Sequence, residues 1–251
     1  MIHSVKVFTK RNALALFLFT LVLTFWQLKL KYHLDDSSGV NSEENMYIEK
    51  KYDSFGKEIS EFLPVKVTVY YETMCPDSRN FFVNQLLPTY EEIPHLITLD
   101  LVPYGKATTT KHGDKYEFSC QHGEGECYGN KLHACAINAI TNQPVLLKVL
   151  TCMISKSFSP DDSVGTCIKP SGLDVDTLIS CGRSSEGDKL LNYYGERTMK
   201  ERPDIFSQFI PTVLLNDDYG RQQLRLKNLR REICAQYPKV FFITFDHIYD
   251  K

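Results

Sequence analysis

The pattern of apolar and polar positions predicts a strand, a helix and a second strand in the first globular part of the chain. Residues 65–71 alternate apolar and polar positions and are rich in β-branched and aromatic side chains, which indicates a strand. The helix that follows begins near Cys75, has apolar residues four positions apart, and should end or kink at Pro88. Residues 96–102 predict a second strand. A strand, a helix and a strand in this order form a parallel βαβ unit.

A long helical stretch comes next, and strand character returns only after Pro203. Apolar residues at helical spacing predict helices over 124–140, from Pro144 to about residue 154, over 173–179 and over 189–199. Residues 212–215 predict a strand, 216–220 a turn and 222–237 a last helix. The order βαβ, inserted helices and ββα is that of an α/β, thioredoxin-like fold with a helical insertion between its two halves.

The segments outside this pattern predict a membrane-directed N-terminus, a spacer and a tail. An apolar run over 13–26 follows basic residues and has no small-x-small cleavage pattern, which favours a signal anchor over a cleaved signal peptide within residues 1–32. We expect the polar residues 33–60 to be a lumenal spacer without regular structure. Residues 61–238 should form the thioredoxin-like domain, and the apolar tail 239–251 either adds a strand or marks an interaction surface.

Composition indicates an oxidising compartment. Eight cysteines are many for a cytosolic chain, and they do not form repeated Cys-x-x-Cys pairs, so disulfides are favoured over zinc. A formal net charge of -2 with 24% charged residues argues against a nucleic-acid partner. The chain contains neither an Asn-x-Ser/Thr sequon nor a C-terminal retention signal, so its final address in the secretory pathway is not given by these signals.

Cys75 is the candidate nucleophile, because it stands where the first strand meets the first helix. Pro76 suits a first helical position, and a thiol at a helix N-terminus faces N–H groups that favour the reactive thiolate. Ser78 takes the place of the second cysteine of a Cys-x-x-Cys pair; it can donate a hydrogen bond to the thiolate but cannot resolve a mixed disulfide. From spacing alone, Cys75 is otherwise a buried structural thiol or one half of a disulfide.

Residues 120–135 resemble the signature of the gamma-interferon-inducible lysosomal thiol reductase family. They contain Cys-Gln-His-Gly, two residues, Glu-Cys, two residues, Asn, four residues and Cys, and the resemblance extends over residues 65–237. It implies a thioredoxin-like enzyme without a bound cofactor that reduces protein disulfides in acidic endolysosomal compartments. It also implies a cis-proline loop at Ile210 and Pro211, where substrate backbone binds beside the reactive sulfur. From the residues alone, Pro211 is equally well a trans proline of an edge strand.

The other cysteines are candidates for structural disulfides: Cys120, Cys127, Cys135, Cys152, Cys167, Cys181 and Cys234. Their number is odd, so a free Cys75 leaves at least one other unpaired or in an intermolecular bond. We expect Cys152 and Cys167 to pair, because they flank a short polar loop over 157–166. Closing a loop of that size stabilises a fold by roughly 3 kcal/mol.

The histidines and carboxylates of the signature are expected to be architectural. Zinc sites usually contain closely spaced cysteine pairs, which residues 120–135 lack, so we expect no bound metal and expect His122 and His133 to cap or pack. Glu126 and Asn130 lie four positions apart, and we expect them to contact one another or a helix terminus.

Together these features predict a lumenal thiol oxidoreductase that reduces or isomerises protein disulfides through Cys75. A small-molecule or protein thiol, or the freed thiol of the substrate, must then release the mixed disulfide. The alternative, kept open by Ser78, is a redox-silent family member that binds polypeptides as a chaperone or adaptor. Joined to the cysteine count and to what the family resemblance implies, the slight excess of basic residues before the apolar run predicts a single-pass type II membrane protein of the endolysosomal system, with residues 33–251 in the lumen; otherwise the protein is secreted or lysosomal.

Overall fold

The computed structural model describes residues 23–24, 48–52 and 58–237, and the chain divides into two compact units, Met1–Phe62 and Leu63–Lys251. In the first unit, β1 (Ile48–Tyr52) pairs antiparallel with β2 (Glu58–Phe62). The expectation that residues 33–60 have no regular structure is therefore wrong for these two segments. Each of them contains β-branched and aromatic residues, which favour strands.

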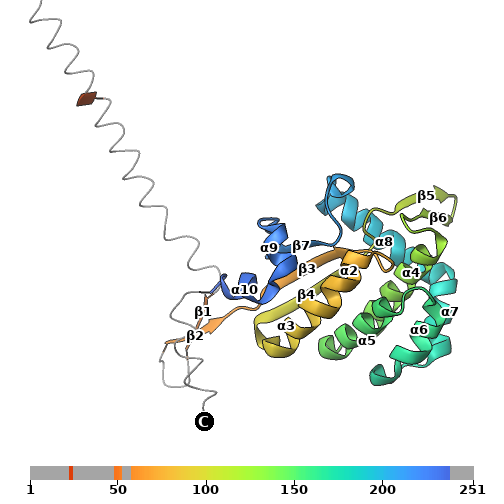
Figure 1. Cartoon of the computed structure of the whole chain (residues 1–251), viewed down its shortest axis with the longest axis horizontal. Coiled ribbons are helices and arrows are strands. Elements are labelled where there is room, and N and C mark those ends of the chain that lie inside the picture. The colour runs from red at the N-terminus through yellow and green to blue at the C-terminus, as the bar shows by residue number, and fades with distance from the viewer. Residues whose placement is uncertain (1–22, 25–47, 53–57, 238–251) are drawn as a thin grey trace, which may run out of the picture. The chain divides into compact units, whose positions relative to one another are not determined.

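A three-stranded sheet in the order β4-β3-β7 forms the centre of the second unit (Figure 1). The predicted βαβ unit is confirmed: β3 (Val65–Tyr71) runs parallel to β4 (Ile97–Pro103). The strand β7 (Thr212–Leu215), from the far end of the sequence, pairs antiparallel with β3. All of β3 except Lys66 is buried, as expected of a central strand covered on both faces.

The helix after β3 continues through Pro88 instead of ending there. It consists of α2 (Pro76–Phe81), a π-helical segment (Phe82–Leu86) and α3 (Leu87–Glu92). Proline has no N–H and its ring clashes with the carbonyl group four residues earlier in an α-helix. The wider π-helical turn directly before Pro88 is consistent with this local disruption. Sequence pattern thus predicts the position of the irregularity and not its form.

Five helices lie between the two halves of the fold, and Figure 1 shows α4 to α7 grouped beside α2 and α3. They are α4 (Glu124–Ala139), α5 (Gln143–Ser155), α6 (Pro160–Cys167), α7 (Val175–Arg183) and α8 (Ser185–Glu201). Four of these correspond to predicted helices. The expectation of a polar loop over 157–166 is wrong, because α6 occupies most of it. The signals are present: Ser159 is the N-cap, Pro160 follows at the first position, and acidic residues fill the first turn.

A hairpin between β4 and α4 is absent from the predicted pattern. It consists of β5 (Thr108–His112) and β6 (Lys115–Ser119), paired antiparallel. Gly113 has φ 61° in the two-residue connection, a conformation that glycine adopts at little cost. Threonines on one side and aromatic residues on the other side of a Gly-Asp pair form a recognisable hairpin signal.

The C-terminal half is also more broken than predicted. After β7, Asp218 forms a single bridge with Leu215, so within residues 212–237 the second strand of the ββα half is reduced to that bridge. The predicted helix 222–237 divides into α9 (Gln222–Lys227) and α10 (Leu229–Cys234). Asn228 causes the break, since its side chain accepts a hydrogen bond from the Arg231 N–H and begins a new helix there. Elsewhere in the described residues, short 3₁₀ turns occur at Pro94–Leu96, Lys169–Ser171 and Ile205–Ser207.

Two disulfides join the inserted helices to one another. Cys135 of α4 is bonded to Cys181 of α7, and Cys152 of α5 is bonded to Cys167 of α6, which confirms the predicted pairing of the latter two. Cys234, a disulfide candidate in the sequence, is instead a free thiol in α10. The odd number of candidates leaves one without a partner, and in the structure that residue is Cys234, since the other six form three pairs.

Within residues 23–24, 48–52 and 58–237, no helix combines the length and the apolar composition that crossing a membrane requires. Apart from Leu23 and Thr24, the apolar run over 13–26 lies outside the described residues, as does the tail 239–251. The signal anchor and the role of the tail therefore stay predictions.

A buried histidine links α4 to β3 in the core. His133 of α4 is buried, and its Nδ1 lies 3.0 Å from the hydroxyl oxygen of Tyr71. Burial lowers the pKa of His133 to about 3, and burial also raises the pKa of Tyr71. His133 is therefore neutral in the folded protein, and a hydrogen bond joins its Nδ1 to the Tyr71 hydroxyl group. The expectation that His133 packs in the core is confirmed.

This histidine makes stability depend on pH. An unfolded histidine titrates near 6.5, so between about pH 6.5 and pH 3 the unfolded chain binds a proton that the folded chain does not. The free energy of unfolding should therefore fall on acidification, with His133 contributing about 2 kcal/mol between pH 7.5 and pH 5. Urea unfolding at several pH values, with His133→Asn beside wild type, measures this contribution. The stability gap between them should shrink by about that amount, whereas the exposed His112→Asn should track wild type; a gap independent of pH contradicts the prediction.

Candidate functional site

Strand β3 places Cys75 at the start of the following helix. Cys75 is the N-cap residue of α2, with extended backbone at φ −66° and ψ 121°, and Pro76 takes the first helical position. Its carbonyl oxygen accepts a hydrogen bond from the Arg79 N–H at 3.1 Å. The side chain is 7% exposed and forms no disulfide. Cys75 is therefore a free thiol at a helix N-terminus.

A loop from the other half of the chain lies against this sulfur. The Ile210–Pro211 peptide bond is cis, which confirms that expectation, and the strand β7 begins at the next residue. Because β7 pairs with β3, with Thr212 opposite Tyr70, the loop lies next to the end of β3. The Cys75 S–H donates to the Ile210 carbonyl oxygen at 3.7 Å. The fold thus brings together three of the predicted site residues, which are separated by about 135 positions in sequence.

Ser78 occupies the same turn but does not contact the thiol. Its side chain is completely buried, and Ser78 Oγ accepts a hydrogen bond from the Glu72 N–H at 3.4 Å. No hydrogen bond joins Ser78 to Cys75 among the described residues. The expected hydrogen bond from Ser78 to the sulfur is therefore not present. The hydroxyl group faces back toward the end of β3, and Cys75 faces the cis-proline loop.

The surroundings of the thiol are apolar. Cys75 belongs to a buried cluster that includes Tyr70, Tyr104, Tyr194, Ile205, Ile210 and Leu214. The segment leading into the cis-proline loop also has two exposed aromatic rings, Phe206 at 47% and Phe209 at 50%. Exposed large apolar side chains near a reactive group are typical of surfaces that contact polypeptides.

The signature segment holds the backbone that precedes the thiol. Asn130 of α4 accepts two hydrogen bonds through Oδ1, from the Thr73 N–H at 3.0 Å and from the Thr73 hydroxyl group at 2.8 Å. A Cβ atom at Gly129 would lie 2.6 Å from Thr73 Oγ1, so glycine is needed for this approach. Asn130 therefore has the expected architectural role, and no hydrogen bond between its side chain and that of Glu126 is found among the described residues. The sequence gives no sign of the part that Thr73 plays, because its partner lies 57 positions later.

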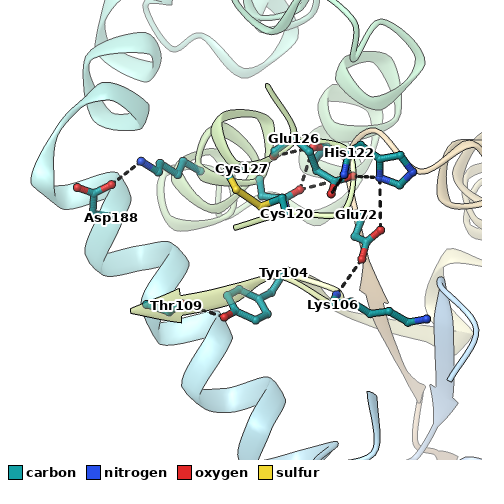
Figure 2. Close-up of a disulfide and its surroundings, with 12 residues drawn as sticks. Glu72, Tyr104, Lys106, Thr109, Cys120, His122, Glu126, Cys127 and Asp188 are labelled. Carbon is teal, nitrogen blue, oxygen red and sulfur yellow. Dashed lines mark hydrogen bonds and ion pairs between the residues drawn. A yellow bond between two sulfur atoms is a disulfide. The ribbon is translucent and has the colours of Figure 1, made fainter. Parts of the chain in front are cut away.

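Glu126 instead binds the start of the signature. Its Oε2 lies 2.6 Å from His122 Nδ1, and its Oε1 accepts a hydrogen bond from the His122 N–H at 3.2 Å. A disulfide between Cys120 and Cys127 closes this segment, as Figure 2 shows. His122 is thus bonded to Glu126 beside the N-terminus of α4, whose N-cap residue is Gly123. Glu72, at the end of β3, also faces His122, a proximity that sequence spacing does not reveal.

The sequence matches proteins of one family. Residues 66–171 match the family model described as gamma interferon inducible lysosomal thiol reductase (GILT). The chain is 34% identical over 184 residues to a gamma-interferon-inducible lysosomal thiol reductase-like protein of Anopheles gambiae, covering 68% of this chain and 76% of that relative. It is 30% identical over 176 residues to gamma-interferon-inducible lysosomal thiol reductase of Mus musculus, covering 69% of this chain and 68% of that relative.

A solved structure shares the architecture. Oxidised BdbD from Bacillus subtilis superimposes with a TM-score of 0.51 at 12% sequence identity, covering 78% of this chain and 94% of that chain. The likeness confirms an α/β thioredoxin-like fold with a helical insertion. With its family match and its curated relatives, the chain belongs to the gamma-interferon-inducible lysosomal thiol reductase family.

Proposed function

We propose that this protein is a lumenal thiol–disulfide oxidoreductase that acts on protein disulfides through Cys75 alone. The observation that carries this proposal is the position of Cys75: a free thiol at the N-terminus of the helix after β3, beside a cis proline, in a member of a thiol reductase family. Ser78 stands where the second thiol of a dithiol site would be.

The first chemical step needs only the groups present. The Cys75 thiolate attacks one sulfur of a substrate disulfide, so that a Cys75–substrate S–S bond forms and the other substrate sulfur leaves as a thiolate. Ser78 cannot take the second step, since an uncharged hydroxyl group is not a nucleophile for a disulfide at physiological pH.

A further thiol must therefore complete the reaction. One external thiol attacks the mixed disulfide and frees Cys75; a second attacks the resulting adduct, so two external thiols become one disulfide while the substrate disulfide is reduced. In a substrate with further disulfides, the freed thiol can instead attack a second disulfide, and the thiol released there then expels Cys75, which yields rearranged substrate disulfides without net reduction. Reduction thus depends on a small-molecule or protein thiol, and isomerisation does not.

The cis-proline loop is the proposed substrate platform. The Ile210 carbonyl group already accepts the Cys75 S–H, so an extended polypeptide lying along Ile210 and Pro211 has its disulfide within reach of the sulfur. Phe206 and Phe209, exposed in the same segment, provide apolar contacts to side chains of the substrate. The burial of Cys75 favours extended or unfolded substrates over a disulfide within a compact fold.

The second candidate is a redox-silent protein that binds polypeptides without exchanging disulfides. Ser78 in place of a resolving cysteine favours it, and the exposed Phe206 and Phe209 serve it equally well. The two candidates differ in whether Cys75 forms a covalent bond to the bound polypeptide.

The proposed location is the lumen of the endolysosomal system, with an N-terminal anchor. The three disulfides and the lysosomal family support a secretory compartment. The anchor rests on the apolar run over 13–26 and on the absence of a cleavage pattern after it.

Covalent trapping separates the two candidates. Wild-type protein expressed in the secretory pathway should accumulate reducible mixed disulfides, because no neighbouring thiol resolves them. Cys75→Ser should abolish these high-mass bands on non-reducing gels, whereas Cys234→Ser, which removes the other free thiol, should leave them. Bands that persist in Cys75→Ser would show that another cysteine reacts. Polypeptides captured equally by wild type and Cys75→Ser, without reducible bands, would favour the redox-silent candidate.

Restoring the second thiol should accelerate turnover. Ser78→Cys creates a resolving thiol one helical turn from Cys75, so an intramolecular attack replaces a bimolecular one. The reduction rate of a disulfide substrate with excess reductant should rise about tenfold or more. The control Cys75→Ser/Ser78→Cys should be inactive. An unchanged rate in a folded Ser78→Cys variant with accessible Cys75 would show that the site lacks other parts of a catalytic centre.

Fractionation tests the location. After carbonate extraction the full-length protein should stay in the membrane pellet, and residues 33–251 should be protected from protease until the membrane is opened. A soluble protein whose N-terminus lies beyond residue 26 would mean that the run is a cleaved signal peptide. Such a result would remove the anchor and keep the lumenal placement.

A further inference from the structure

A second cluster of reactive side chains includes Glu72, three residues before Cys75, but not Cys75 itself. Glu72 at the end of β3, His122 before α4 and Glu126 in α4 each offer a ligand atom, and these atoms all lie within 4.8 Å of one another (Figure 2). The side chains of Glu72 and Glu126 are 1% and 0% exposed, and that of His122 is 36% exposed. Two carboxylates are thus buried behind one imidazole that reaches solvent.

The hydrogen bonds to the Glu72 carboxylate come from uncharged donors. Its Oε1 accepts the Lys106 N–H at 2.8 Å, and its Oε2 lies 3.7 Å from His122 Nδ1, beyond hydrogen-bond distance. The Gln121 amide, with its nitrogen turned toward Glu72, donates to both oxygens at 3.2 Å. Glu126 has the closer contact to His122, 2.6 Å from Oε2 to Nδ1, and also accepts the His122 N–H.

The charges of the cluster do not balance. In the described part of the chain, no lysine or arginine forms an ion pair with Glu72 or Glu126. Lys106 donates its backbone N–H to Glu72, but its side-chain charge lies beyond ion-pair distance. Buried carboxylates are stable when paired, protonated or bound to a cation.

We infer that Glu72, His122 and Glu126 form a binding site for a divalent transition-metal ion, with Zn²⁺ as the best fit. Zn²⁺ accepts imidazole nitrogen and carboxylate oxygen at about 2.0–2.2 Å, which places tetrahedral ligands about 3.3–3.5 Å apart. The two distances from His122 Nδ1, 2.6 Å to Glu126 and 3.7 Å to Glu72, lie on either side of that spacing. The exposed edge of His122 leaves room for water as a fourth ligand.

The donor set explains why cysteine spacing does not reveal this site. Cys120 and Cys127 are joined in a disulfide and cannot bind metal, and their bond holds His122 and Glu126 in place. Glu72 comes from a strand 50 positions before His122 in sequence, so no short motif contains all three ligands. The imidazole ligand also separates this site from one for Ca²⁺ or Mg²⁺, which prefer oxygen ligands. The inference does not depend on the proposed function of Cys75.

Isothermal titration calorimetry with ZnCl₂ tests the site. The protein is the full-length chain in detergent, stripped of metal at neutral pH, with Cys75→Ser and Cys234→Ser because free thiolates also bind zinc. We expect one zinc ion per chain. His122→Ala should weaken binding at least about tenfold, whereas His112→Ala, which removes an exposed histidine paired with Glu117, should not.

Thermal unfolding gives a second measurement. Zinc at 100 times its dissociation constant should raise Tm by about 5–10 °C in the Cys75→Ser/Cys234→Ser protein, and the rise should vanish in His122→Ala. The Tm without zinc shows whether His122→Ala is folded; if it is not, His122→Asn takes its place.

Three results would overturn the inference. The first is no measurable zinc binding to the folded protein. The second is unchanged zinc affinity in a folded His122→Ala or His122→Asn variant, which would place the ion elsewhere. The third is calcium bound as tightly as zinc, because oxygen ligands alone would then account for the binding.

Discussion

The two hydrogen bonds from Thr73 to the Asn130 side chain connect the inserted helices to the end of the central strand. Because β3 ends at Tyr71, no neighbouring strand supplies an acceptor for the buried Thr73 N–H, and the Asn130 side chain supplies it instead. Gly129 allows α4 to approach closely enough for this contact. The insertion therefore determines the backbone path into Cys75, and the family signature is best understood as the part of the insertion that does so.

Four of the five residues from Tyr71 to Cys75 contact parts of the chain that are distant in sequence. Tyr71 contacts His133, Glu72 contacts Lys106 and His122, Thr73 contacts Asn130, and Cys75 contacts Ile210. Three regions of the chain, at Lys106, at residues 122–133 and at Ile210, thus converge on five consecutive residues. Each of these contacts is made by Cys75 or by a residue at most four positions before it.

The pattern of apolar and polar residues predicts those helices and strands whose own residues have a clear periodicity. The alternation over 65–71 and the helical spacing over 124–140 are of this kind, and the structure has β3 and α4 there. The hairpin β5–β6 and the helix α6 carry turn and capping signals that hydrophobic periodicity alone does not detect. The break at Asn228 is different, because it depends on whether one polar side chain caps a new helix or faces solvent. The same distinction applies to the site. The residues around Cys75 in sequence are enough to predict its position, whereas the roles of Glu72 and Thr73 depend on partners that are distant in sequence.

The lone thiol at this site has a kinetic consequence. A dithiol enzyme releases its substrate on a timescale fixed by its own neighbouring cysteine, whatever the surroundings. If Cys75 acts as proposed, with Ser78 buried and bonded to the Glu72 N–H, a mixed disulfide that awaits reduction has a lifetime inversely proportional to the concentration of external thiols. Under that proposal, a polypeptide captured in a thiol-poor compartment stays attached, and the same polypeptide is released quickly where reductant is abundant. The residence time of a captured polypeptide would then report the supply of reducing equivalents in its compartment.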